Sequence, residues 1–202
     1  MTLEALPRCT WPGLSDPIYT AYHDTEWGVP KTDERALFEQ IILEGFQSGL
    51  SWLTILKRRE TFRAAFHQFD AERIASYTDH DKARLMADPG IIRNRLKVDA
   101  TIDNARAYLK LRERIPLSNF LWDFVDGRPQ INRYQAHGDV PAATEVSKKI
   151  SKALKAEGFR FVGPTTMYAF MQASGLVNDH LVSCHRHAPC STLMKKFKHG
   201  SP

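Results

Sequence analysis

Apolar residues recur at the spacing of an α-helix along most of the chain, and this pattern predicts an all-α fold. The clearest helix runs from Asp33 to Gln47, where one side carries Leu37, Phe38, Ile41 and Ile42. A second predicted helix runs from Ser51 to about His67, and its apolar side consists of Trp52, Ile55, Leu56, Phe62 and Phe66. No internal repeat interrupts the pattern.

Capping and helix-breaking residues divide the remainder of the chain into further helices. Asp70 and Asp79 are predicted N-caps of two short helices, because a carboxylate can accept hydrogen bonds from the free N–H groups of a first turn. The other predicted helices are a long one that follows Gly90 and ends near Arg114, one from Ser118 to just before Gly127, and a pair at Ser147 to Glu157 and Pro164 to Ser174.

Residues 127–141 lie between the helix that starts at Ser118 and the last helix pair, and they are rich in glycine and proline. This composition predicts a connection between two lobes. A chain of 202 residues is long enough for one domain with a substantial core. We therefore expect a single domain over residues 1–202. Its first lobe would comprise about 1–32 and 142–202, its second about 33–127, and the connection about 128–141.

Composition narrows the class of protein. The chain is 43% hydrophobic and 25% charged, has no apolar run of membrane-spanning length, and lacks a cationic start followed by an apolar stretch, so we expect a cytoplasmic protein with no membrane partner. Three cysteines do not suggest a set of disulfides and leave thiolates free for a metal. A net charge of +5 suits a polyanionic partner but is also common in proteins that bind none.

Two pairs of metal-ligating residues lie at opposite ends of the chain. Cys9 and His23 are near the N-terminus, and His180 and Cys184, four residues apart, are near the C-terminus. Two thiolates and two imidazoles are a typical tetrahedral ligand set for structural zinc, and one helical turn would bring His180 and Cys184 to the same ion. The same C-terminal segment contains alternative ligands, which are His185, His187 and Cys190.

Glu44 lies at the edge of the apolar side of its helix and is expected to point inward. A buried carboxylate needs a partner, and a salt bridge or a neighbouring helix terminus would be a purely structural one. The surrounding sequence offers another partner, because aromatic side chains near a carboxylate form a box for a flat, cationic or N–H-rich ring such as a methylated purine. These aromatic residues are Trp11, Tyr19, Tyr22, Trp27 and Trp52.

The last predicted helix pair forms a hairpin whose second helix begins after Gly163 with Pro164, Thr165 and Thr166. Free N–H groups and the positive end of the helix dipole can bind a phosphate there, and Gly163 has no side chain to block it. The same residues are also compatible with a packing corner that binds nothing.

Several segments together closely resemble the 3-methyladenine DNA glycosylase I family, a divergent branch of the helix-hairpin-helix DNA glycosylases. They are Asp16 to Pro30, Leu43 to Trp52, Gly90 to Arg93, and Phe161 to Gly163 through Gly175 to His180. The resemblance implies a two-lobed helix-hairpin-helix fold, with no redox cofactor and one structural zinc joining the terminal segments. It implies zinc ligands at Cys9, His23, His180 and Cys184, a base pocket of Glu44 with Tyr22, Trp52, Trp11 and Trp27, beside Tyr19, and a DNA clamp at Gly163, Thr165 and Thr166.

By this resemblance the chain would be a monomeric, monofunctional enzyme that hydrolyses the N-glycosidic bond of 3-methyladenine in double-stranded alkylated DNA and so begins base excision repair. Glu44 would be its catalytic residue, which recognises the lesion and stabilises charge. The nucleotide must leave the duplex. Leu50 could fill the gap, or it could pack in the core. The superfamily usually has an Asp where this chain has Asn178, and an amide cannot act as a general base. Two alternatives remain: a non-catalytic, zinc-stabilised sensor of damaged bases, and a small-molecule hydrolase.

Overall fold

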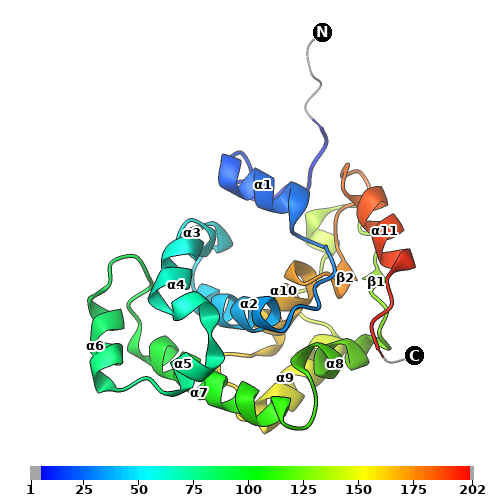
Figure 1. Ribbon diagram of the computed structural model, residues 1–202. Coiled ribbons are helices and arrows are strands. Elements are labelled where there is room, and N and C mark those ends of the chain that lie inside the picture. The colour runs from blue at the N-terminus through cyan, green and yellow to red at the C-terminus, as the bar shows by residue number, and fades with distance from the viewer. Residues whose placement is uncertain (1–5, 201–202) are drawn as a thin grey trace.

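The structure is a computed structural model that describes residues 6–200, and its elements are almost all helices (Figure 1). The prediction of a mainly α-helical chain is confirmed. Helix α2 (Glu34–Gln47) lies at the centre, and its main neighbours are α3 (Trp52–Leu56), α7 (Arg95–Arg112), α8 (Leu117–Trp122) and α10 (Pro164–Ala173). Within residues 6–200, the exception to all-α is a pair of two-residue parallel strands, β1 (Gln130–Ile131) and β2 (Val177–Asn178).

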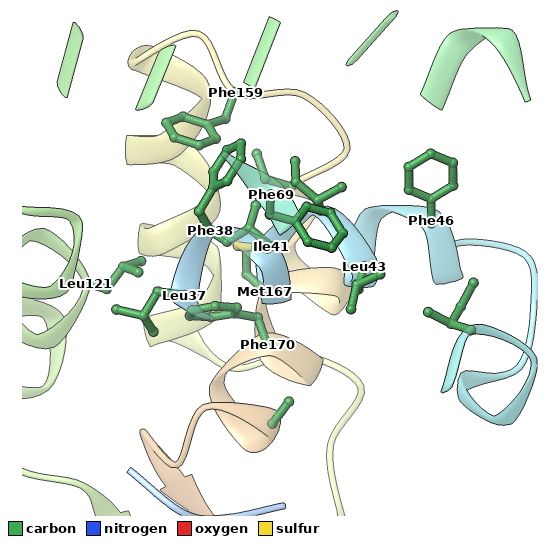
Figure 2. Packing of buried hydrophobic residues seen from close by; sticks show 14 of the residues in the cluster. Leu37, Phe38, Ile41, Leu43, Phe46, Phe69, Leu121, Phe159, Met167 and Phe170 are labelled. Carbon is green, nitrogen blue, oxygen red and sulfur yellow. The ribbon is translucent and has the colours of Figure 1, made fainter. Parts of the chain in front are cut away.

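Helix α2 (Glu34–Gln47) forms the middle of the hydrophobic core. Its N-cap is Asp33, whose side chain accepts a 2.8 Å hydrogen bond from the backbone N–H of Ala36. Figure 2 shows its apolar side chains packed with those of α10 and of the segments around them, namely Leu37, Phe38, Ile41, Leu43, Phe46, Met167 and Phe170 with Phe69, Leu121 and Phe159. Every residue from Gln40 to Phe46 is buried, so Glu44 lies inside the protein as predicted.

The predicted helix from Ser51 to His67 is wrong as a single element. It consists of α3, α4 (Arg59–Ala65) and a short 3-10 turn at His67–Phe69, with a break at Lys57 and Arg58. The break lets the two halves face different neighbours: Phe62 packs against Phe46 with ring centroids 4.8 Å apart, whereas Trp52 packs against Tyr22. Tertiary packing, rather than a helix-breaking residue, therefore sets the boundary.

Other helix starts differ from the prediction by a few residues. Asp70 caps α5 (Ala71–Ala75) as expected. Asp79 is the first residue of α6 (Asp79–Ala87) rather than its cap, because Thr78 and Asp81 form a capping box one residue earlier. The long helix α7 starts at Arg95 and not directly after Gly90, since Asn94 caps it by accepting a hydrogen bond from the N–H of Lys97.

The C-terminal part contains the predicted helix pair as α9 (Glu145–Ala156) and α10. Gly158 ends the turn of α9 with φ +97°, a conformation that favours glycine. The predicted helix at Ser118 is α8 with a 3-10 turn at Asp123–Val125. The predicted connection, residues 128–141, holds β1 and a 3-10 turn at His137–Asp139, and is thus tied to β2 rather than free.

Two helices were not predicted: α1 (Pro17–Thr25) and α11 (His187–Lys196). In Figure 1 they lie on the same side of the molecule, although one comes from the start of the chain and the other from its end. No helix within residues 6–200 is long and apolar enough to span a bilayer. The predicted domain limits include residues 1–5 and 201–202, which lie outside the described part.

Candidate functional site

The four predicted metal ligands come together in a buried cluster between the two chain ends. Cys9 precedes α1, His23 lies in the last turn of α1, and His180 and Cys184 lie in the loop between β2 and α11 rather than in a helical turn. The sulfur of Cys184 is 3.6 Å from Nδ1 of His180 and 3.6 Å from Nε2 of His23. A tetrahedral zinc site with Zn–S near 2.3 Å and Zn–N near 2.05 Å requires N–S separations of about 3.6 Å.

Both imidazoles are oriented so that one ring nitrogen faces the cluster. Nδ1 of His23 is 2.8 Å from Oδ1 of Asp24, and Nε2 of His180 is 3.1 Å from the carbonyl oxygen of Trp27. Such outer partners are the usual companions of metal-bound histidines. Hydrogen bonds from the Cys9 thiol and the two imidazoles hold the pKa of Cys184 below its ordinary value, which favours the thiolate that a metal needs. The residues present therefore fit a zinc ion.

The three alternative ligands have other partners. Nε2 of His185 lies 3.1 Å from Asp24, outside the group of four. Nε2 of His187 lies 2.9 Å from the carbonyl oxygen of Asn132. The sulfur of Cys190 accepts from the guanidinium of Arg186 at 3.5 Å, and burial raises the pKa of the Cys190 thiol. Cys190 therefore lies outside the group of four.

A cavity of about 280 Å³ lies next to the cluster, with Cys9 contributing to its wall. This volume is near the lower end of the range of about 300 to 1,000 Å³ typical of small-molecule sites. All six predicted pocket residues line it, together with polar residues from the C-terminal half. The lining includes Trp11, Tyr19, Tyr22, Trp27, Glu44, Gln47, Trp52, His137, Gln172 and Asp179.

Glu44 is 3% exposed, and only one of its carboxyl oxygens is paired. Oε1 accepts a 2.8 Å hydrogen bond from Nε2 of Gln40, whereas Oε2 is buried without a hydrogen-bond partner among the described residues. Burial raises the pKa of Glu44 to about 8, although the hydrogen bond from Gln40 and the charge of Lys31 act in the opposite direction. The salt bridge that would make Glu44 purely structural is not formed within residues 6–200.

The aromatic walls leave a second polar atom without a partner. Tyr22 and Trp52 are buried with ring centroids 5.5 Å apart, and Trp11 meets Trp27 edge to face at 4.5 Å. Nε1 of Trp52 is buried and has no acceptor in the part of the chain that the structure describes. Buried donors and acceptors are nearly always paired, so an unpaired acceptor on Glu44 and an unpaired donor on Trp52 indicate a ligand with both kinds of group.

The position that sequence reasoning chose in the Asn178 segment does not face the cavity. Asn178 is fully buried, and its amide donates to the carbonyl oxygen of His187 and to the hydroxyl of Ser191. The next residue, Asp179, lines the cavity instead and accepts hydrogen bonds from Asn132, Tyr168 and Gln172. Successive residues of an extended segment point to opposite sides, which was the signal that could have identified Asp179.

The predicted DNA-contacting residues lie at the surface or partly exposed. Gly163 is the N-cap of α10, Thr165 is exposed, and Thr166 is half-buried. A Cβ on Gly163 would come no closer than 4.0 Å to the Thr166 hydroxyl, so the interior does not require glycine there. Leu50 is 43% exposed in the loop between α2 and α3, so it is not part of the core.

Comparison with known proteins agrees with this geometry. The family model described as methyladenine glycosylase matches residues 11–187, a range that begins at the first cavity tryptophan and includes all the candidate metal ligands except Cys9. The chain belongs to the methyladenine glycosylase family. That assignment agrees with the resemblance stated from the sequence motifs.

Among individual relatives, the chain is 52% identical over 180 residues to DNA-3-methyladenine glycosylase 1 of Escherichia coli strain K12, covering 89% of this chain and 96% of the relative. A crystal structure of a 3-methyladenine DNA glycosylase I is 53% identical, with a TM-score of 0.87 over 90% of this chain and all of the other. The Staphylococcus aureus enzyme, whose structure is described as the basis of 3-methyladenine recognition, is 40% identical with a TM-score of 0.83, covering 85% and 92%.

Proposed function

We propose that this chain is a monofunctional DNA glycosylase that hydrolyses the N-glycosidic bond of 3-methyladenine in alkylated DNA and thereby begins base excision repair. The observation that carries the proposal is the half-paired carboxyl group of Glu44 on the wall of an aromatic cavity of about 280 Å³. The curated relatives from Escherichia coli and Haemophilus influenzae, about half identical to this chain, are both named as DNA-3-methyladenine glycosylases.

Selectivity follows from the burial of Glu44. Burial makes ionisation of the Glu44 carboxyl group unfavourable. A neutral, undamaged adenine brings no positive charge that could compensate for this cost. A purine alkylated at N3 carries positive charge and pairs with the carboxylate in a site of low dielectric. The faces of Tyr22 and Trp52 attract the same cationic ring. The pocket therefore favours the lesion by charge as well as by shape.

The chemical step needs little acid assistance, because the alkylated base departs as a neutral molecule. The nucleotide is first rotated out of the duplex, at a cost of a few kcal/mol. Asp179 is the second carboxyl group on the cavity wall, and it is placed to steady positive charge that develops on the sugar. No lysine among the described residues lines the cavity, which agrees with hydrolysis and not with a Schiff-base lyase.

The partner in this proposal is double-stranded DNA with alkylated bases. The backbone N–H groups at the start of α10, with Gly163, Thr165 and Thr166, would hold a phosphate, so that α9 and α10 act as the helix-hairpin-helix clamp. Leu50, exposed on its loop, would fill the gap left by the rotated base.

The two lobes, about 1–32 with 142–202 and about 33–127, joined by 128–141, would lie on either side of the base pocket. The monomeric state and the cytoplasmic location expected from the sequence belong to the same proposal.

Zinc is the metal we propose for the cluster of Cys9, His23, His180 and Cys184, with one ion per chain. Four protein ligands leave no open position, so the ion would have a structural role and take no part in hydrolysis. It would hold the N-terminal segment, which carries Trp11, against the loop that follows β2.

The decisive experiment is incubation of the purified protein with DNA treated with a methylating agent, followed by chromatography of the released bases. Free 3-methyladenine that accumulates with time and exceeds the molar amount of protein supports the proposal. Binding to methylated DNA without release of base would instead identify a non-catalytic sensor. Release of base from free nucleosides at the same rate would identify a small-molecule hydrolase.

A further inference from the structure

Behind the cavity, three polar side chains form a continuous hydrogen-bonded line. Nζ of Lys31 donates to Oε1 of Gln40 at 3.2 Å, and Nε2 of Gln40 donates to Oε1 of Glu44 at 2.8 Å. Gln40 is 6% exposed, and neither it nor Lys31 belongs to the cavity wall. The hydrogen-bonded line therefore runs from Lys31 through the buried amide of Gln40 to the Glu44 carboxyl group, which faces the base pocket.

The order of the line fixes the orientation of the Gln40 amide. An ammonium group can only donate hydrogen bonds, so the oxygen of Gln40 must face Lys31. The NH₂ group of Gln40, which can only donate hydrogen bonds, then faces Glu44 and needs an oxygen of its carboxyl group as the acceptor. This arrangement occupies Oε1 of Glu44 and leaves Oε2, which has no partner among residues 6–200, for a ligand.

The backbone of the molecule holds both ends of the line in place. The N–H of Lys31 donates to the carbonyl oxygen of Ser174 at 3.0 Å, and its carbonyl oxygen accepts from Nε1 of Trp122 at 2.9 Å. Gln40 and Glu44 are four residues apart on α2 and so lie on the same face of the helix. The line thus has little freedom to rearrange when a base enters.

We propose that Gln40 and Lys31 are positioning residues of the base site, which hold the Glu44 carboxyl group with one oxygen presented to the alkylated base. The inference rests on the proposed function, because it assumes that Glu44 recognises the base. Its consequence is specific: whatever Gln40 and Lys31 contribute to base recognition passes through Glu44 and disappears when the carboxylate is absent.

A double-mutant cycle tests this dependence. Wild type, Gln40→Leu, Glu44→Gln and the double variant are titrated with 3,9-dimethyladenine, a cation that keeps the charge of the alkylated base in DNA, and binding is followed by the fluorescence of the tryptophans that line the cavity. Gln40→Leu should raise the Kd about tenfold in the wild-type background, the effect of losing one hydrogen bond to a charged group. In the Glu44→Gln background it should raise the Kd by less than about twofold, because the interaction energy is already lost.

Lys31→Met is a second test variant in case Gln40→Leu does not fold, because it leaves the hydrogen bond between Gln40 and Glu44 in place. It should weaken binding only when Glu44 is present, and Lys31→Arg, which keeps a cationic donor, should restore part of the affinity. Lys57→Met is the matched control, since Lys57 is an exposed lysine that pairs with Asp16. Its Kd should equal that of the wild type in both backgrounds.

The outcomes distinguish the positioning role of Gln40 and Lys31 from the role of Glu44 in the proposed function. If Gln40→Leu and Lys31→Met change the Kd by the same factor with and without the carboxylate, or not at all, the positioning role is refuted while the proposed function stands. If Glu44→Gln alone leaves both the Kd and the release of 3-methyladenine from DNA unchanged, the role of Glu44 in the proposed function is refuted instead.

Discussion

Replacing Glu44 with glutamine should raise the stability of the protein while lowering its activity. In the folded protein the carboxyl group is buried, and its pKa is raised to about 8 from an ordinary value of 4.5. Glutamine keeps the size of the side chain and one acceptor for the amide of Gln40, but it has no charge to bury. Wild type and Glu44→Gln therefore differ chiefly in the free energy that it costs to ionise the buried side chain at position 44.

The size of the effect follows from the two pKa values. Between pH 4.5 and 8 the folded wild type binds more protons than the unfolded chain, so its free energy of unfolding falls as the pH rises. The difference between 8 and 4.5 limits this loss to about 5 kcal/mol, which Glu44→Gln avoids. For a domain of this size, that free energy corresponds to a difference in Tm of about 10 to 20 °C.

The assay is thermal unfolding of both proteins across pH 5 to 9. The Tm of Glu44→Gln minus that of wild type should grow with pH up to about pH 8 and then level off. Other titrating groups are common to both proteins and cancel in the difference. Single-turnover release of 3-methyladenine should fall at the same time, by roughly 1 to 3 kcal/mol of transition-state stabilisation. A variant that is less stable than wild type at every pH and still excises normally would refute the assignment of Glu44 to the base pocket.

Further predictions concern the metal, the hairpin and the exposed loop. Cys184→Ala should lose zinc in metal analysis and lower the Tm, whereas Cys190→Ala should retain about one zinc per chain; full zinc content in Cys184→Ala would move the site elsewhere. Gly163→Asp should weaken binding to damaged and undamaged duplex by about 1.5 to 3 kcal/mol, and unchanged affinity would make the hairpin a packing corner. Leu50→Ala should change stability by no more than about 0.5 kcal/mol but slow excision from duplex relative to single-stranded DNA, and equal slowing on both would exclude a wedge.

Helices with strong local signals could be predicted from the sequence. The apolar side of α2 and its cap Asp33 gave the correct limits, and the Gly163–Pro164 pair marked the start of α10. The break within the predicted helix from Ser51 to His67 could not be predicted, because it depends on how Phe62 packs against Phe46 from another helix.

Some residues of the candidate site could likewise be predicted from the sequence, and others could not. Glu44 and the aromatic residues could be selected because a carboxylate at an apolar position needs a reason to be there. The line from Lys31 through Gln40 could not, since nothing in the sequence indicates that the loop before α2 folds back against its second turn. Alternation along an extended segment indicates that Asn178 and Asp179 point to opposite sides, but which of them lines the cavity depends on the pairing of this segment with β1.

The candidate metal cluster joins residues that are 171 positions apart in the chain, Cys9 and His180. Contacts of such long range form late, because a large loop must close before they contribute any stability. The tryptophan side of the pocket can thus be completed only after the ribosome has released the segment that follows β2. A chain truncated directly after β2 would keep the packing of α2 against α10 and its Glu44 carboxyl group, yet it would have no closed pocket in which that group could distinguish a damaged base from a normal one.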